Sequence, residues 1–280
     1  MIGLIRHPDV DSHIRGLDEA RRFLEQSGIE VWEAPRHARL RVPRSTRLLV
    51  TLGGDGTLLS VARHAAQRDI PVLGVNLGRL GFLTELEADD LCTGLRRFLE
   101  GDFRLDLRTL LDVVVVREHR LLRHTLGLNE FVLQRAAEDG LVRLRLLVDG
   151  QEIGQIDADG VIVATATGST AYALAAGGPI LEPTVEDLLL VPMAPFALTV
   201  RPIVLPPDQG IVIELPRSVA LGTVDGGPVW RLRPGDRVQL SVFERRFRMV
   251  RFTPPERFYA LLRQKLGWGL PLVPTPGQSS

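Results

Sequence analysis

The residues best placed to do chemistry form a Gly-rich turn with one carboxylate, Gly53-Gly54-Asp55-Gly56-Thr57, between an apolar strand candidate and a helix start. Glycines let a ligand approach the backbone closely, and free N–H groups at a helix start favour a phosphate. A carboxylate opposes that field, so Asp55 is interpreted as a base for a hydroxyl proton or as a holder of Mg²⁺. The structural alternative is a plain helix N-cap. A dinucleotide-binding fingerprint is excluded, because Leu59 occupies the position of its third Gly.

The next strand candidate, Val72–Val75, also leads into a Gly-rich turn, which contains Gly78 and Gly81. Open parallel sheets bind ligands at the carboxyl ends of their strands, so the two Gly-rich strand ends predict one shared crevice. Phe82 follows Gly81 and has two interpretations, a plug of the apolar core or an aromatic wall for a base.

Two polar stretches in the second half of the chain suit a nucleoside. The pair Asn129-Glu130 precedes an apolar run and could bond adenine edges and ribose hydroxyls, with turn chemistry as the alternative. The stretch from Asp159 to Tyr172 runs from a strand candidate into a hydroxyl-rich turn and then small residues. Its hydroxyls can donate to phosphate or base, and its small residues leave room for a flat ligand. An ordinary hydroxyl N-cap within 165–170 is the alternative.

Composition bounds the class of protein. The 280 residues are enough for about two domains. Because 34 basic residues match 34 acidic ones, there is no basic excess of the kind that nucleic-acid binding needs. Lys265 is the only Lys, and the other 33 of the 34 basic residues are Arg. A P-loop ATPase, which needs a Lys after its glycines, is thereby excluded.

Other constellations are missing. Cys92 stands alone and the six His residues are scattered, so neither a disulfide framework nor a Cys-rich zinc site is expected, and the metal ligands stay unknown. The N-terminus is charged too early for a signal peptide. The apolar stretch from Leu188 to Val200 is short and interrupted by Pro192 and Pro195, which excludes a membrane span. We expect a cytoplasmic protein that binds neither nucleic acid nor membrane.

The elements that would position these residues change in type along the chain. The first hundred residues alternate strands with helices, which predicts an α/β domain with a parallel sheet. The elements expected there are Ile2–Arg6, Asp18–Gln26, Leu48–Leu52, Thr57–Arg68, Val72–Val75 and Asp89–Glu100. Short β-rich runs follow, which predict an all-β, sandwich-like domain of two packed layers. These runs are Val113–Val116, Leu121–Leu126, Phe131–Gln134, Leu141–Val148, Val161–Ala164, Thr199–Leu205, Ile211–Leu215, Val229–Leu232, Arg237–Val242 and Arg246–Phe252.

Two helices complete this organisation. One is expected at Thr170–Ala176, and the last opens on a capping box, Thr253-Pro-Pro-Glu256, and closes at Gly267. The expected division is therefore an α/β domain at 1–104 that carries the Asp55 turn and an all-β domain at 105–252. A helix at 253–270 packs back on the first domain, and a Pro/Gly/Ser-rich tail at 271–280 is expected to be disordered.

Taken together and in this order, the four stretches resemble the NAD kinase family, from Leu48 to the last helix. The turn at 53–57 alone is shared with diacylglycerol and sphingosine kinases and, more distantly, with 6-phosphofructokinase. The other stretches are more specific, above all Thr167-Gly-Ser-Thr-Ala-Tyr172 with Gly177-Gly178 behind it. The resemblance implies a 6-phosphofructokinase-like first domain and phosphoryl transfer from ATP or polyphosphate to the adenosine 2′-hydroxyl of NAD⁺. It also implies Mg²⁺ or another divalent cation and a homodimer or homotetramer.

The resemblance assigns roles to residues as well. It implies Asp55 as the general base, and it implies NAD binding by Asp55, Gly56, Phe82, Asn129, Glu130, Asp159, Thr170, Ala171, Tyr172, Ala173, Leu174, Ala175 and Ala194. The turn itself predicts phosphate binding by Gly53, Gly54 and Thr57, with Arg79 as a helper because no Lys is near.

Three positions depart from the family pattern. Ala166 stands where the family usually has Pro, and Asp157 stands where many members carry a basic residue. The stretch Asp225-Gly-Gly227 lacks the polar side chain that the family often has after that Asp. They concern affinity more than reaction type. Two alternative functions remain, a lipid or sugar kinase of the same superfamily and a non-catalytic NAD(P)-binding sensor. The first has no need of the stretch from Thr167 to Tyr172, and the second would have lost Asp55.

Overall fold

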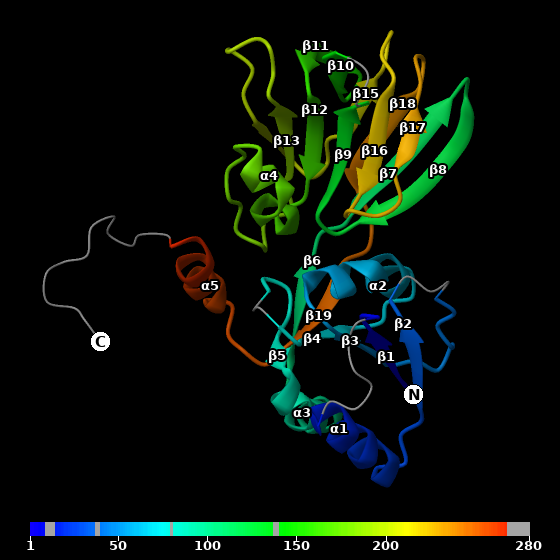
Figure 1. Cartoon of the computed structure of the whole chain (residues 1–280), viewed down its shortest axis with the longest axis vertical. Coiled ribbons are helices and arrows are strands. Elements are labelled where there is room, and N and C mark those ends of the chain that lie inside the picture. Colours follow the sequence, from blue (N-terminus) through cyan, green and yellow to red (C-terminus); the bar gives the residue numbers. More distant parts are fainter. Residues whose placement is uncertain (9–14, 37–39, 79–80, 137–139, 268–280) are drawn as a thin grey trace, which may run out of the picture.

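The structure is a computed structural model that describes residues 1–8, 15–36, 40–78, 81–136 and 140–267 (Figure 1). The tail expected to be disordered, 271–280, lies outside the described residues, as does Arg79.

The first sheet has the strand order β2-β1-β3-β4-β19-β6, and β5 pairs with β4. All of these pairs are parallel except β6 with β19. The central strands are apolar without alternation because both faces of the sheet are covered, which is typical of parallel sheets. The strands are β1 (Ile2–Arg6), β2 (Val31–Pro35), β3 (Leu48–Leu52), β4 (Val72–Asn76), β5 (Leu86–Glu87), β6 (Arg104–Arg108) and β19 (Phe247–Arg251).

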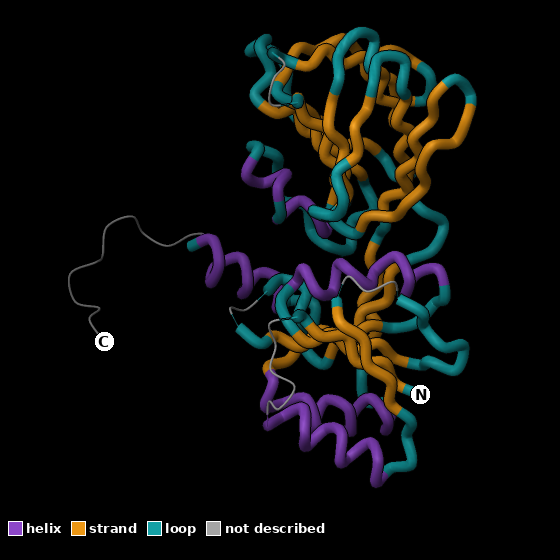
Figure 2. Tube along the Cα trace, turned by 45° about the vertical axis from the view of Figure 1, so that its right-hand side comes forward, coloured by secondary structure: helices purple, strands orange, loops and turns teal. Residues whose placement is uncertain are grey.

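Helices cover the two faces of this sheet (Figure 2). The helices α1 (Arg15–Gln26) and α3 (Leu91–Glu100), the latter preceded by η1 (Ala88–Asp90), lie together on one face. On the opposite face, α2 (Asp55–Gln67) packs on β3, β4 and β19 and also contacts strand β8 of the second domain. The first turns of α2 therefore lie where the two domains meet.

The second domain consists of two antiparallel six-stranded sheets, β11-β10-β15-β18-β7-β8 and β14-β13-β12-β9-β16-β17. Alternate residues of both sheets point into one apolar core, so the predicted sandwich is confirmed. The strands are β7 (Leu111–Arg117), β8 (Arg120–Gly127), β9 (Glu130–Arg135), β10 (Val142–Val148), β11 (Gln151–Ala158), β12 (Gly160–Ala164), β13 (Leu188–Met193), β14 (Ile203–Leu205), β15 (Ile211–Glu214), β16 (Ala220–Val224), β17 (Trp230–Leu232) and β18 (Arg237–Val242).

The expected membership of one strand was wrong. The run Arg246–Phe252 was expected in the all-β domain, but β19 lies in the first sheet between β4 and β6. Nearly continuous burial along β19 suits a strand with covered faces. We propose that the first domain comprises residues 1–108 together with 246–252, and that the second domain lies in the chain between these two segments.

The two remaining helical segments also differ from expectation. The helix expected at Thr170–Ala176 is a 3₁₀ turn, η2 (Thr167–Thr170), followed by the single turn α4 (Tyr172–Ala175). The last helix, α5 (Arg257–Leu266), ends at Gly267 in the left-handed region as predicted. None of the described helices is long and apolar enough to cross a membrane.

The predicted capping box at the start of α5 does not form. The Thr253 hydroxyl donates to a Glu85 carboxylate oxygen at 2.8 Å, and Glu256 makes no cap hydrogen bond. A guanidinium N–H of Arg257 donates to the Glu85 carbonyl oxygen at 3.1 Å. The start of α5 is therefore tied to Glu85 of the first domain, while packing of the whole helix on that domain stays a prediction.

Candidate active site

The Gly-rich turn joins β3 to α2, and Asp55 is the first helical residue. Gly54 is the N-cap, so the plain N-cap interpretation of Asp55 is wrong. Gly53 has φ of +152°, and a Cβ there would lie 2.4 Å from the Thr57 hydroxyl oxygen. Only Gly fits that position. The carboxylate of Asp55 therefore lies at the N-terminus of α2, where the first N–H groups of a helix have no partner within the helix.

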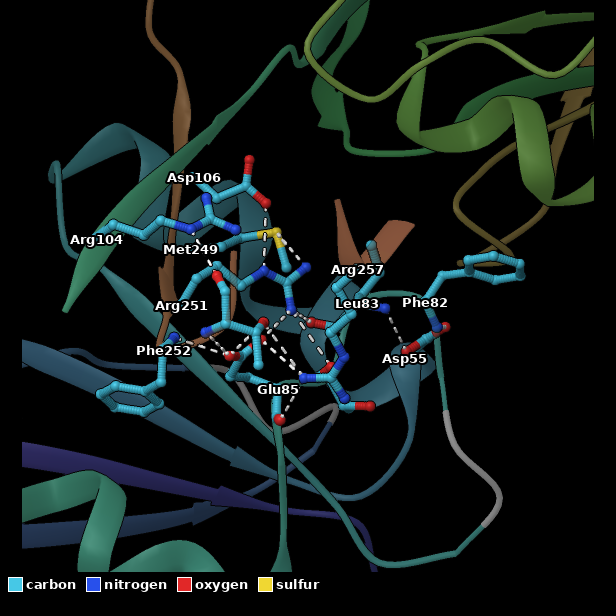
Figure 3. A network of polar contacts seen from close by, with 12 residues as sticks. Asp55, Phe82, Leu83, Glu85, Arg104, Asp106, Met249, Arg251, Phe252 and Arg257 are labelled. Carbon is cyan, nitrogen blue, oxygen red and sulfur yellow. Dashed lines mark hydrogen bonds and ion pairs between the residues drawn. The ribbon is translucent and has the colours of Figure 1, made fainter. Parts of the chain in front are cut away.

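The Asp55 carboxylate reaches across to the loop after β4 (Figure 3). Its Oδ2 accepts a hydrogen bond from the Phe82 backbone N–H at 2.8 Å, and its Oδ1 accepts one from Leu83 at 3.0 Å. A Cβ at Gly81 would lie 1.9 Å from Oδ1, so the absence of a side chain there makes room for the carboxylate. Each oxygen keeps a lone pair with which to accept a hydroxyl proton. The two Gly-rich strand ends form one site, as predicted.

Phe82 is half-buried and belongs to none of the apolar cores of the described residues. Lys265 is the only Lys of the chain, and its ammonium lies 5.1 Å from the centre of the Phe82 ring. The ring also lines a small cavity of about 70 Å³ with Arg104 and Phe258. The core-plug interpretation is therefore wrong, and the aromatic wall for a base stays a prediction.

A single carboxylate holds the turn that presents Asn129 and Glu130. The Asp225 side chain accepts backbone N–H bonds from Leu128, Asn129 and Glu130 at 2.7, 2.9 and 3.0 Å. The Asn129-Glu130 pair thus does have turn chemistry, but Asp225 supplies it and leaves both polar side chains available. Asp225 itself was not predicted as a site residue. The two glycines that follow it, Gly226 and Gly227, were the available signal in the sequence.

Glu130 is buried, and its Oε2 has no hydrogen-bond partner. Burial, together with the negative charge of Asp225, raises the pKa of the Glu130 carboxyl to about 8, although a backbone hydrogen bond from Tyr172 lowers it. Burial also raises the pKa of Asp225 to about 6, against the three backbone N–H bonds. Glu130 therefore holds a proton at neutral pH and can donate as well as accept a hydrogen bond.

This proton predicts a pH dependence of stability. Because the pKa of Glu130 is about 8 in the folded chain against an ordinary value of 4.5, the folded state binds the extra proton between these limits. The free energy of unfolding should fall as the pH rises from 5 to 8, by at most about 1.4 kcal/mol per pH unit. Urea denaturation of the wild type and Glu130→Gln at pH 5, 6, 7 and 8 measures it. Equal slopes for both proteins would contradict the prediction.

The hydroxyl-rich turn packs directly on the Asn129 turn. The Thr165 hydroxyl donates to the Leu128 carbonyl oxygen at 2.6 Å and accepts from the Gly168 N–H at 3.2 Å. A Cβ at Gly168 would lie 2.1 Å from the Asn129 carbonyl oxygen. The N-cap of η2 is Ala166, which makes no side-chain cap bond, so the hydroxyl N-cap interpretation is wrong; the Thr165 hydroxyl instead joins the two stretches. These bonds hold the turn at Ala166, where the family usually has Pro.

Tyr172, with 42% of its surface exposed, lines a cavity of about 420 Å³ with Asp159 and Arg135. The Asp159 carboxylate forms an ion pair with Arg135 at 2.8 Å. Ala194, at φ of +41°, lies next to Met193, which lines the same cavity. Of the strip after Thr170, Ala173 is fully buried in the core under β12 and β13, while Ala171, Leu174 and Ala175 are partly or fully exposed.

The first-domain and second-domain halves of the site share one space. Gly56 and Asp225 both line a cavity of about 340 Å³ between α2 and the turn after β16. This volume is therefore bordered by the neighbour of the base candidate, Gly56, and by Asp225, which holds the Asn129-Glu130 turn. Asp159 borders the Tyr172 cavity instead, and Ala194 follows Met193, which lines it; within the described ranges no hydrogen bond or ion pair joins Asp159 to the Asp55 turn.

The carboxylates near the turn limit how a metal could be held. Among the residues that the structure describes, no group of three or more His, Cys, Asp or Glu could hold an ion. Asp55, whose oxygens accept two N–H bonds, could offer at most one ligand oxygen beside its role as base. This donor set fits a Mg²⁺ that is bound mainly by substrate phosphates and water, as in other phosphoryl-transfer sites.

A Gly-rich strand end at a helix N-terminus, one positioned carboxylate and a nucleoside-sized cavity on an all-β domain define a two-domain kinase that phosphorylates a nucleotide. A model of the ATP-NAD kinase N-terminal domain matches residues 33–103, and one of the ATP-NAD kinase C-terminal domain matches residues 128–252. The chain belongs to the NAD kinase family.

Relatives and solved structures agree with this membership. The NAD kinase of Syntrophobacter fumaroxidans is 42% identical over 83% of this chain and 83% of its own length. NAD kinase 2 of Gloeobacter violaceus is 42% identical over 81% of this chain and 74% of its own length. Yeast NADH kinase complexed with NADH superposes with a TM-score of 0.86 at 26% identity, over 98% of this chain and 89% of that one. The NAD kinase of Archaeoglobus fulgidus in complex with ATP gives 0.73 at 28% identity, over 94% and 97%.

Proposed function

We propose that the chain transfers a phosphoryl group from ATP or polyphosphate to the adenosine 2′-hydroxyl of NAD⁺, giving NADP⁺, with Asp55 as the general base. The observation that carries this proposal is the position of the Asp55 carboxylate. Two backbone N–H groups orient it at the Gly-rich turn, next to Gly56, which faces the Asp225-held adenosine turn across one cavity. Kinship with proteins crystallised with NADH and with ATP supports both substrates.

The reaction asks the protein to position groups and to accept one proton. Asp55 takes the proton of the 2′-hydroxyl while the oxygen of that hydroxyl forms the new bond to phosphorus. The bond between phosphorus and the bridging oxygen of the donor breaks at the same time. We propose that the Gly54 N–H and the Thr57 hydroxyl bind the donor phosphates, and that Gly53, whose own N–H donates to the Val75 carbonyl oxygen at 3.0 Å, lets the phosphates approach the backbone. The Thr57 oxygen is buried without a partner, which supports that role. Bound Mg²⁺ would neutralise charge on those phosphates.

The second domain would bind the adenosine half of NAD⁺. The buried, unpartnered Oε2 of Glu130 supports a hydrogen bond to a ribose hydroxyl, because an orphaned buried oxygen is costly without a ligand. Asn129 would bond the base, and the strip from Thr170 to Ala175 would line its pocket. Asp159, which lines the Tyr172 cavity, and Ala194, which follows the cavity residue Met193, would contact the rest of the NAD⁺ molecule, with Asp159 near the nicotinamide end.

Tyr172→Ala should raise the KM for NAD⁺ about tenfold, since an aromatic stacking contact contributes about 1–3 kcal/mol, while kcat changes little. Steady-state kinetics with varied NAD⁺ measure it. The matched control is Tyr259→Ala, which removes the other tyrosine of the chain, also exposed at 55%. Equal KM values for the two variants would remove Tyr172 from the adenine pocket.

The decisive experiment incubates the protein with Mg²⁺ and NAD⁺, adds ATP or polyphosphate in separate tubes, and assays NADP⁺ with an NADP-specific dehydrogenase. We expect NADP⁺ in at least one tube, and the pair identifies the donor. Folded protein that binds NAD⁺ but makes no NADP⁺ would favour the sensor. Protein that binds no NAD⁺ would favour the lipid or sugar kinase.

We also propose that the chain works as a homodimer or homotetramer in the cytoplasm. Phe196 and Leu198, on the loop between β13 and β14, are 79% and 83% exposed. Two neighbouring exposed apolar side chains on one loop favour association between copies of the chain. The resemblance supplies the rest of the support.

A further inference from the structure

Behind the Asp55 loop lies a buried network of charged side chains from four separate segments (Figure 3). Its centre is Arg251 on β19, whose side chain is 7% exposed, between the carboxylates of Glu85 at 1% and Asp106 at 9%. The Arg251 Nε donates to Asp106 at 3.2 Å and Nη1 donates to Glu85 at 3.1 Å. Burial of three such charges is costly, and the mechanism above uses none of them.

Arg251 also reaches the backbone that holds the base. Its Nη1 lies 3.0 Å from the Leu83 carbonyl oxygen and 3.3 Å from that of Thr84. The N–H of the same Leu83 residue donates to Asp55 Oδ1. One residue, Leu83, therefore connects the guanidinium on its carbonyl side with the base on its amide side.

The Leu83 side chain packs in the apolar core of the first domain, but among the described residues no further hydrogen bond fixes the backbone between Gly81 and Glu85. The next anchor along the chain is the Glu85 N–H, which donates to the Gly74 carbonyl oxygen at 2.8 Å. The Thr84 hydroxyl is buried without a partner. The orientation of the Phe82 and Leu83 N–H groups thus depends on where Arg251 holds the carbonyls of Leu83 and Thr84.

The guanidinium is in turn fixed from the side of the second domain. Asp106 accepts two bonds from Arg108, at 2.9 and 2.6 Å. The Arg108 Nη1 donates to the Thr167 hydroxyl at 3.3 Å, at the start of the hydroxyl-rich turn. Arg251 is therefore oriented by a chain of bonds that begins at the nucleotide-binding domain.

We infer that Arg251 is a positioning residue for the phosphoryl transfer, because its bonds to the Leu83 and Thr84 carbonyls set the direction of the N–H groups that aim the Asp55 carboxylate. This inference rests on the proposed function for its kinetic consequence, though not for its geometry. It requires arginine, since one planar fork must bond a carboxylate through Nε and carbonyls through Nη1 at once, and a Lys ammonium cannot span both.

The geometric test is amide hydrogen exchange, measured by NMR on the full chain, with Arg251→Lys against the wild type. We expect the Leu83 amide to exchange at least about tenfold faster in the variant, because its bond to Asp55 opens locally. The Glu85 amide, bonded to Gly74, should keep its rate and serves as the internal reference. Unchanged exchange at Leu83 would overturn the inference.

The kinetic test uses the same variant. Arg251→Lys should lower kcat about 10²-fold, as expected for a misplaced catalytic group, with less than about a threefold change in the KM for NAD⁺. The matched control is Arg257→Lys, the same substitution on a neighbour that bonds Glu85 but not the carbonyls of 83 and 84. It should keep kcat within about twofold of the wild type. Equal losses in both variants, or a rise in KM alone, would overturn the inference.

A second variant covers the case in which Arg251→Lys fails to fold. Glu85→Gln keeps the shape and the oxygen that accepts from the N–H groups of Phe252 and Thr253, but turns an amide N–H₂ toward Arg251. The Leu83 amide should again exchange faster, and kcat should fall. If the wild type makes no NADP⁺, the proposed function fails while exchange at Leu83 still decides the geometry. If the wild type is active and both variants keep its kcat, the inference fails alone.

Discussion

Asp55→Asn is expected to lower kcat for NADP⁺ formation by about 10²–10⁴-fold, the usual contribution of a general base, while the chain folds and binds NAD⁺ normally. The amide keeps the shape of the carboxylate and one oxygen, which can accept the N–H bond of either Phe82 or Leu83, but it cannot take up the 2′-hydroxyl proton. Initial rates at saturating NAD⁺ and donor measure the loss, and a binding titration with NAD⁺ measures what is kept.

The matched control is Asp89→Asn, the same substitution at an exposed carboxylate in η1, which should leave kcat unchanged. A turnover of Asp55→Asn close to that of the control would remove Asp55 as the base. Loss of NAD⁺ binding together with loss of turnover would assign Asp55 to binding instead.

Gly81→Ala is expected to lower kcat by about 10²-fold, because a displacement of reacting groups by about 1 Å is enough for such a loss. A Cβ at this position would lie 1.9 Å from Asp55 Oδ1 and 2.6 Å from its Cγ, so the carboxylate must leave its place or the loop must move. Either movement breaks the pair of N–H bonds from Phe82 and Leu83. Steady-state rates and a thermal melt separate a lost alignment from a lost fold.

The control for this substitution is Gly78→Ala in the same loop. Nothing lies within 4 Å of a Cβ built at Gly78, so this variant should keep the wild-type kcat. If Gly81→Ala were as active as Gly78→Ala, the carboxylate would not be confined to the place seen here.

The sequence predicted elements well wherever one pattern dominated. The strands β1, β3 and β4 are mostly apolar runs, and the glycines Gly28 and Gly267 marked the ends of α1 and α5. The strand β11 (Gln151–Ala158) was missed because three of its first five residues, Gln151, Glu152 and Gln155, are polar, as an edge strand allows. The strand β16 was missed because Gly222 interrupts a short run.

The sheet to which a strand belongs was harder to predict than its existence. The run that forms β19 has the β-rich composition of the second domain, and nothing local distinguishes it. Its pairing with β4 and β6 depends on contacts more than 100 residues away in the chain. The capping box, which was predicted but does not form, has the same explanation. Thr253 bonds Glu85, a partner that the local spacing cannot reveal.

The candidate site divides in the same way. Asp55, Asn129 and Glu130 were found because their types stand out beside glycines or an apolar run. Asp225 and Arg251 were not, since their roles arise from backbone groups that they bond. The chain contains 33 Arg and 34 acidic residues, so nothing in the composition distinguished Arg251 from the other arginines.

The return of β19 to the first sheet has a consequence for how the protein could have arisen. The backbone N–H of Phe243 donates to the carbonyl oxygen of Leu110 at 2.8 Å, so the chain leaves the first domain and re-enters it at a single point. The sandwich is therefore an insertion between two strands, β6 and β19, that already pair with each other. A short hairpin in its place would leave every strand pair of the first sheet intact, and a small ancestral α/β domain could have gained its nucleotide-binding half in one event.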